Sequence, residues 1–214
     1  MSKQTNIDNG AGRATSITLL ILDESGSMSS IAHTVVETHQ RIIRGILQEQ
    51  EQHPELQQLV SVWTFEGNRI QERIALQKAH AGMLKLDYKP LGNTPLYDAI
   101  GKAAGKLEAF LHSGELGGEV RVSVAVLTDG YENSSRSFSR DEINRLVSRL
   151  RNIGWEFSYY GADHDVERVA MELNFNEHMQ IDKSADGMAH FVADYQSKEL
   201  KRKLDLIKKQ YPSE

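Results

Sequence analysis

The chain has 214 residues, of which 39% are hydrophobic and 26% charged, so it is long enough to bury a substantial core in one compact domain. It contains no cysteine, which excludes a disulfide framework and thiolate chemistry, and its formal net charge of −5 argues against a nucleic-acid partner. The apolar run at residues 17–22 is too short to span a bilayer and no signal-peptide pattern is found near the start, so we expect a cytoplasmic protein with no membrane partner.

The first part of the chain predicts a tail, a strand and a helix. Residues 1–14 are polar and rich in Gly and Asn, which predicts a flexible N-terminal tail ahead of a single domain over residues 15–210. The sequence SITLLILD, residues 16–23, has continuous rather than alternating apolar residues, as expected for a strand buried on both faces. A helical stripe of apolar residues follows, formed by Ile31, Val35, Ile42 and Ile46.

The middle of the chain predicts two strands and a second helix. Residues 58–67 read as a strand, and residues 69–76 as a shorter, more polar strand that suits a sheet edge. The loop LGNTP then leads into a helix that ends at Gly114, with Thr94 as a candidate N-cap and Pro95 as its first residue.

The last part of the chain continues the alternation of strands and helices. Residues 119–130, EVRVSVAVLTDG, form the clearest strand, and Ser139 with Glu142 has the spacing of a capping box at the next helix start. A further strand, short helix and short strand lead to a long amphipathic helix over about 184–209. Its basic residues predict a solvated face, and they are Lys198, Lys201, Arg202, Lys203, Lys208 and Lys209.

This order of elements predicts a three-layer α/β/α fold of the doubly wound, Rossmann-like kind. The sheet is expected to have six strands, mostly parallel, with one antiparallel edge strand. In such sheets ligands bind outside the carboxyl ends of the strands. Asp23 and Asp129 each end a predicted strand, so both are expected at this edge.

The loop DESGS, residues 23–27, carries a distinctive set of oxygen donors. In an extended loop alternate side chains project to the same side, so Asp23, Ser25 and Ser27 can point together. A carboxylate with two hydroxyls is a hard donor set that suits Mg²⁺, with Mn²⁺ or Ca²⁺ as alternatives. Three residues cannot fill a six-coordinate shell, and later loops offer Thr94 and Asp129.

The sequences DESGSMSS, GNTPLYDAI and VAVLTDG together resemble the von Willebrand factor A (vWA) domain, with its metal-ion-dependent adhesion site. The resemblance covers residues 15 to 185 and is closest to the intracellular prokaryotic and phage members. It implies metal ligands at five positions, which are Asp23, Ser25, Ser27, Thr94 and Asp129. It also implies a non-enzymatic, Mg²⁺-dependent module that captures an Asp or Glu side chain of a protein partner. At family level that partner could be an ATPase or a protein encoded in the same operon.

Two other readings stay open at this point. A metal-dependent hydrolase or phosphotransferase could use Asp23 as nucleophile, although Ser25 stands where such enzymes generally carry a second acid. In an assembly protein the metal would only fix the loops. Glu66 and Asp163 also close strands and are expected at the rim of the same cleft rather than as ligands.

Overall fold

The structure is a computed structural model that describes residues 13–212. Its sheet has six strands in the order β3-β2-β1-β4-β5-β6, in which β3 is antiparallel to β2 and the other neighbours are parallel. The strands are β1 Ala14–Asp23, β2 Leu56–Glu66, β3 Arg69–Lys78, β4 Val120–Thr128, β5 Glu156–Gly161 and β6 Glu177–Gln180. The predicted fold class, including the antiparallel edge strand, is confirmed.

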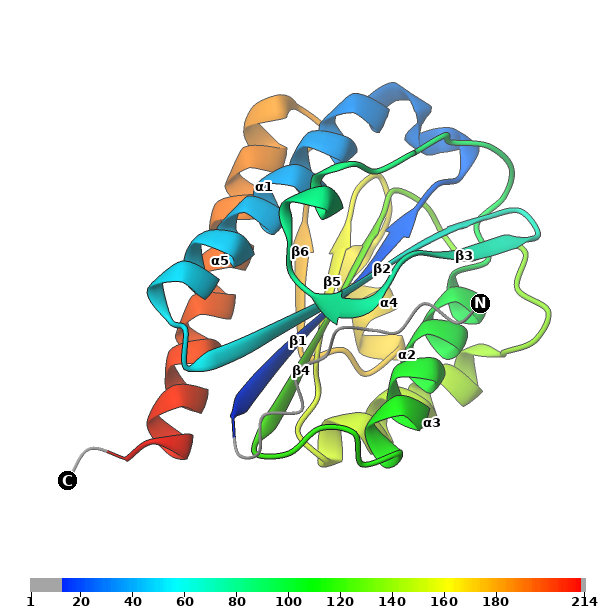
Figure 1. The fold of residues 1–214 in the computed structure, drawn as a ribbon. Helices are drawn as coiled ribbons and strands as arrows, with labels where there is room; N and C mark the ends of the chain where they lie inside the picture. The colour runs from blue at the N-terminus through cyan, green and yellow to red at the C-terminus, as the bar shows by residue number, and fades with distance from the viewer. Residues whose placement is uncertain (1–12, 213–214) are drawn as a thin grey trace, which may run out of the picture.

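Helices cover both faces of this sheet, with α1 and α5 on one side and α2, α3 and α4 on the other (Figure 1). They are α1 Ala32–Gln52, α2 Leu96–His112, α3 Arg140–Asn152, α4 Val166–Glu172 and α5 Ala185–Gln210, with 3-10 turns η1 Gly26–Ile31 and η2 Ala81–Leu84. The capping box at Ser139 and Glu142 is present at the start of α3. Within residues 13–212, no helix combines the length and apolar character needed to cross a bilayer.

The central strand β1 explains why the two helical layers share one sheet. Every residue of β1 is buried, because β2 and β4 flank it and helices cover both of its faces. Ile17, Leu19 and Ile21 lie in the core that α2, α3 and α4 share, whereas Leu20 and Leu22 lie in the core that α1 and α5 share. The continuous apolar run in the sequence therefore reports two cores that meet at one strand.

The start of the chain falls mostly outside the described residues. Of the predicted tail, residues 1–14, only Arg13 and Ala14 are described. Ala14 is already the first residue of β1 and is fully buried against Leu56 and Leu206.

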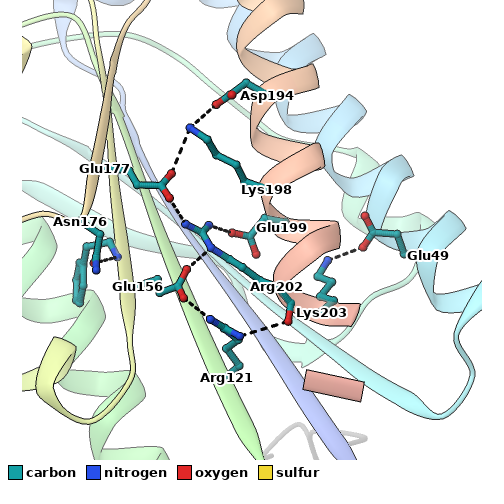
Figure 2. A network of polar contacts seen from close by, with 11 residues as sticks. Glu49, Arg121, Glu156, Asn176, Glu177, Asp194, Lys198, Glu199, Arg202 and Lys203 are labelled. Carbon is teal, nitrogen blue, oxygen red and sulfur yellow. Dashed lines mark hydrogen bonds and ion pairs between the residues drawn. The ribbon is translucent and has the colours of Figure 1, made fainter. Parts of the chain in front are cut away.

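The basic residues of α5 correct one expectation from the sequence. The predicted solvated face is in part a buried network of ion pairs between α5 and the sheet (Figure 2). Arg202 pairs with Glu156, Glu177 and Glu199, and Lys203, only 3% exposed, binds Glu49 of α1 at 2.6 Å. The helical spacing showed where these residues lie along α5, but it could not show that acids from β5, β6 and α1 face them.

Candidate functional site

The candidate site lies at the carboxyl edge of the sheet, where β1 and β4 end side by side. The chain leaves β1 through α1 towards β2, and it leaves β4 through α3 towards β5 on the other side. Connections that depart in opposite directions open a crevice between the two strand ends. Asp23 and Asp129 stand at this crevice, as the sequence predicted.

Asp23 is fully buried, and both of its carboxylate oxygens accept hydrogen bonds. Oδ1 accepts from the backbone N–H of Ser25 at 2.7 Å, and Oδ2 accepts from the hydroxyl of Thr128 at 2.6 Å. Burial is the main cause that raises the pKa of Asp23 to about 6, and the charge of Asp129 adds to it against hydrogen bonds from Thr128 and from the backbone and side chain of Ser25. The protein's own groups therefore compensate the ionised form only in part.

A chain of short contacts joins the two loops after β1 and β4. The Ser25 and Ser27 hydroxyl oxygens are 3.2 Å apart, and the Ser27 hydroxyl donates to Oδ1 of Asp129 at 2.5 Å. Asp129 is 4% exposed and Ser25 is 1% exposed, whereas Ser27 between them is exposed, so the contact chain reaches from the protein interior to the surface. Four of the five predicted residues are thus brought together through direct contacts and the Asp23–Ser25 backbone bond.

The fifth predicted residue, Thr94, reaches the same edge on the loop before α2. Its backbone N–H donates to Oδ1 of Asn133 at 2.8 Å, and its carbonyl accepts from the N–H of Asn133 at 3.2 Å. Thr94 is buried, and its hydroxyl oxygen lies 3.8 Å from the position of a Cβ added at Gly130, directly after Asp129. The loop that carries Thr94 is therefore fixed against the loop that carries Asp129.

Thr94 does not cap α2, which differs from the N-cap expectation. The cap position belongs to Pro95, which makes no side-chain cap hydrogen bond. Loop side chains after β4 cap the helix instead: Glu132 accepts from the N–H of Tyr97 at 3.0 Å, and the Ser135 hydroxyl accepts from the N–H of Asp98 at 3.0 Å. The local sequence around Thr94 could not reveal caps that come from another loop.

Gly92 allows the loop before α2 to approach the loop after β1. Its carbonyl accepts from the N–H of Gly26 at 3.0 Å, and its φ of +74° lies in the left-handed region that favours glycine. A Cβ at this position would meet the Glu66 carboxylate at 2.8 Å. Glu66 itself pairs with Arg69 at 2.8 Å, which agrees with its expected place at the rim.

Two further acids position the loops and were missed in the sequence. Glu24 points away from Asp23 into the protein, where it pairs with Arg73 of β3 at 2.7 Å and accepts from the N–H of Lys89. Asp98 accepts from three successive backbone N–H groups of the loop after β4, at residues 136–138. Desolvation opposes ionisation, but these bonds outweigh it and lower the pKa of Asp98. Each acid lies next to a recognised motif residue, yet its partner lies 38 or more residues away.

Lys183 is the one cation in direct contact with the predicted ligands among the described residues. It lies between β6 and α5, and its ammonium is 2.7 Å from Oδ2 of Asp129 and 2.5 Å from Oδ2 of Asp163. Partial burial disfavours the ammonium, but bonds to both carboxylates outweigh burial and raise the pKa of Lys183. Asp163 is thus linked to the site through Lys183, consistent with its expected rim position.

The residues present fit a hard divalent cation by the chemistry of their donors. Two carboxylates and three hydroxyl side chains offer oxygen only, which suits Mg²⁺ and disfavours softer metals. Across residues 13–212 no group of three or more His, Cys, Asp or Glu side chains that could hold a metal is found. The candidate site has only two such residues, Asp23 and Asp129, so the hydroxyl groups of Ser25, Ser27 and Thr94 would have to supply its other protein ligands.

No family model matches the chain, and no curated protein matches it. Solved structures do match in fold. Proximal thread matrix protein 1 from the mussel byssus gives a TM-score of 0.62 at 17% identity over 87% of this chain and 46% of that chain. A von Willebrand factor type A protein from Catenulispora acidiphila gives 0.64 at 14% identity, over 86% of this chain and 42% of that one. The vWF domain of the type V pili tip protein Mfa5 from Porphyromonas gingivalis gives 0.61 at 8% identity, over 88% and 97%.

This chain spans less than half the length of the byssus protein and of the Catenulispora protein, but nearly all of the Mfa5 domain. At these identities the likeness concerns the backbone arrangement alone. Together with the six-stranded sheet and the order of its connections, it shows that the chain has the fold of the von Willebrand factor A domain.

Proposed function

We propose that the chain is a non-enzymatic, divalent-metal-dependent protein-binding module. The vWA fold itself suggests a protein-interaction module. The observation that carries the finer proposal is the contact chain Ser25–Ser27–Asp129 beside the fully buried Asp23. Oxygen donors from two separate loops meet there around carboxylates that the protein neutralises only in part.

In this proposal Asp23, Ser25, Ser27, Thr94 and Asp129 hold Mg²⁺, with Mn²⁺ or Ca²⁺ as alternatives. When bound, the cation would supply an exchangeable coordination position that an Asp or Glu side chain of a partner protein can fill. The protein's own residues fix the donors: Thr128 and the Ser25 N–H orient the Asp23 carboxylate, and Asn133 holds the loop of Thr94. Asp98 and Glu132 anchor the loop of Asp129 to α2.

The first test measures metal binding directly. Titration calorimetry and thermal unfolding with Mg²⁺ or EDTA are compared for the wild type, Asp23→Ala and Thr94→Ala. We expect Mg²⁺ to raise the melting temperature of the wild type and to leave both variants unchanged, since a ligand that binds only the folded state stabilises it. The matched control is Asp205→Ala, which removes an exposed acid from α5 and should behave as the wild type.

The second test concerns the partner. Affinity capture from the native host is carried out in Mg²⁺ and in EDTA, with Asp23→Ala as control, and the captured protein is then purified. Binding of the purified protein should require Mg²⁺ and should be lost when one of its surface acids is replaced by the amide. Equal affinity in EDTA would contradict the proposal.

One observation supports a metal-dependent phosphotransferase or hydrolase as a second candidate. Lys183 provides the cation beside Asp129 that a phosphoryl group would need, and the sequence near the motif had offered none. Against it, the Asp23 carboxylate is fully buried and each of its oxygens accepts a hydrogen bond, so neither oxygen is exposed to a substrate phosphorus atom. Turnover of a generic phosphoester that is lost in Asp23→Asn would favour the enzyme over the binding module.

A further inference from the structure

Lys183 has no role in the predictions made from the sequence. Its ammonium bridges Asp129, a predicted metal ligand with a 1% exposed side chain, and Asp163, whose side chain is 64% exposed. The next residue, Ser184, is the N-cap of α5 and accepts from the N–H of Gly187 at 3.1 Å. One side chain therefore connects the candidate site to the start of the longest helix.

The charge on Lys183 and the charge of a divalent cation would act on the same carboxylate. Oδ1 of Asp129 faces Ser27 and Oδ2 faces Lys183, so the whole carboxylate is engaged by the protein. Two cations a few ångströms apart repel, and the repulsion is large where water is excluded. Lys183 has a second partner in Asp163, so it can lose Asp129 without becoming unpaired.

We propose that Lys183 is an intramolecular competitor of the divalent cation: it neutralises Asp129 when no metal is bound and keeps only Asp163 when the metal binds. This inference rests on the metal site proposed above. It makes Lys183 a residue that sets the metal affinity and holds the loops together in the metal-free protein.

The response to metal is confined to the connection between β6 and α5. The second half of α5 is held by Arg202, which pairs with acids of β5 and β6, and by Lys203, which pairs with Glu49 of α1 (Figure 2). The first half packs in the core through Met188, Phe191, Val192 and Tyr195. Release of Lys183 from Asp129 breaks none of these contacts.

The test uses the purified full chain and Mg²⁺ alone, with no partner. The dissociation constant for Mg²⁺ is measured by calorimetry for the wild type, Lys183→Met and Lys183→Arg. We expect Lys183→Met to bind Mg²⁺ about tenfold more tightly, because one positive charge next to the cation is removed. Lys183→Arg keeps the charge and should show no gain in affinity. The matched control Lys78→Met removes an exposed lysine opposite Leu59, far from the carboxyl edge, and should leave the constant unchanged.

Thermal unfolding separates competition from a merely structural role. In EDTA, Lys183→Met should melt below the wild type, since Asp129 loses its buried partner. In saturating Mg²⁺ the same variant should show a larger rise in melting temperature than the wild type. A variant that melts lower in both conditions, with an unchanged dissociation constant, overturns the inference, as does an equal gain in affinity for Lys183→Arg. Absence of Mg²⁺ binding by the wild type itself would instead overturn the proposed metal site, and this inference with it.

Asp163→Asn gives a second variant that leaves the Lys183–Asp129 pair in place. Without Asp163, Lys183 has only Asp129 as partner. Asp163→Asn in the otherwise wild-type protein should therefore bind Mg²⁺ more weakly than the wild type. In the Lys183→Met background the same substitution should have a clearly smaller effect. Equal effects in both backgrounds would show that Asp163 acts on the metal directly and would contradict the transfer of Lys183.

Discussion

Two clusters of charged residues along α5, one just before its first residue and one under its second half, differ in how their acids are paired. In the network under the second half of α5, each acid contacts at least one of the cations Arg121, Lys198 and Arg202, and the acids are Glu156, Glu177, Asp194 and Glu199. At the carboxyl edge of the sheet, Lys183 pairs with Asp129 and Asp163, whereas the buried carboxylate of Asp23 contacts no cation among the described residues.

The difference separates a structural cluster from a candidate binding site. An ion network in which every acid contacts a cation can hold elements in register without any external group. A buried carboxylate without a cation partner is unfavourable in its ionised form, and burial accordingly raises the pKa of Asp23. The following predictions test whether the two clusters behave so differently.

The largest effect is expected from removal of α5. Deletion of residues 184–214 takes Met188, Phe191, Val192 and Tyr195 out of the core, together with every ion pair that α5 makes with the sheet. The four side chains contribute on the order of 10 kcal/mol by burial, which is comparable to the total stability of a typical domain. We expect the truncated protein to lose cooperative unfolding, as measured by circular dichroism during heating. An unchanged melting temperature would show that α5 does not support the sheet.

Disruption of the ion network under the second half of α5 should cost stability but not metal binding. Arg202→Met leaves three acids without their shared partner, and we expect a loss of about 3 kcal/mol in the free energy of unfolding. The affinity for Mg²⁺ should stay that of the wild type. Lys201→Met, an exposed neighbour on the same helix, is the control for stability, and a changed Mg²⁺ affinity in Arg202→Met would break the distinction between the clusters.

His39 tests a buried titratable group that belongs to neither cluster. It lies in α1 under α5 with both ring nitrogens unpartnered among the described residues, and burial lowers its pKa to about 4. The folded state therefore binds fewer protons than the unfolded state between pH 4 and 6.5, so stability is lost as the pH falls through this window. The loss should reach about 3 kcal/mol.

Substitution of His39 should reduce this loss of stability at acidic pH. We expect the denaturant midpoint of His39→Leu to fall less between pH 7 and pH 4.5 than the midpoint of the wild type. The other titrating groups are the same in both proteins, so the difference reports His39. His33→Leu, which alters an exposed histidine of the same helix, should keep the wild-type slope. Parallel pH profiles for the two variants would contradict the assignment.

The smallest effect concerns the buried carboxylate that has no cation partner. In EDTA, Asp23→Asn removes a buried carboxylate whose pKa is raised by burial and by the charge of the neighbouring Asp129. We expect a gain of about 1 kcal/mol, or roughly 2–4 °C in melting temperature, together with loss of the stabilisation by Mg²⁺. Asp205→Asn, on the exposed side of α5, should change neither quantity, and a destabilised Asp23→Asn would show that the carboxylate is already compensated.

Much of the fold could be predicted from the sequence, because it follows from local pattern. The continuous apolar run before Asp23 and the polar strand from Arg69 gave the buried centre and the antiparallel edge of the sheet, and both are confirmed. The sequence predicts that Asp23, Ser25 and Ser27 converge along an extended loop; they do lie together, but Ser25 is extended whereas Ser27 lies in the 3-10 helix η1. Their role as metal ligands stays a prediction.

What could not be predicted depends on pairing between distant side chains. Periodicity places Arg202 and Lys203 on a helix, but it does not show that Glu177 and Glu49 face them. Lys183 had one available signal: it follows the last strand, whose carboxyl end must reach the same edge as Asp129 and Asp163. A metal site is predicted from oxygen donors, and a lysine at a strand end is not such a donor.

The direction of α5 has a consequence for how the ends of the described residues lie relative to the crevice. The helix begins beside the candidate site, and its 26 residues extend ~39 Å to the other edge of the sheet, where Lys209 pairs with Glu119. Ala14 starts β1 at that same far edge, next to Glu119. Arg13 and Pro212, the first and last described residues, therefore lie at the edge of the sheet opposite the crevice between β1 and β4, and the crevice opens away from both.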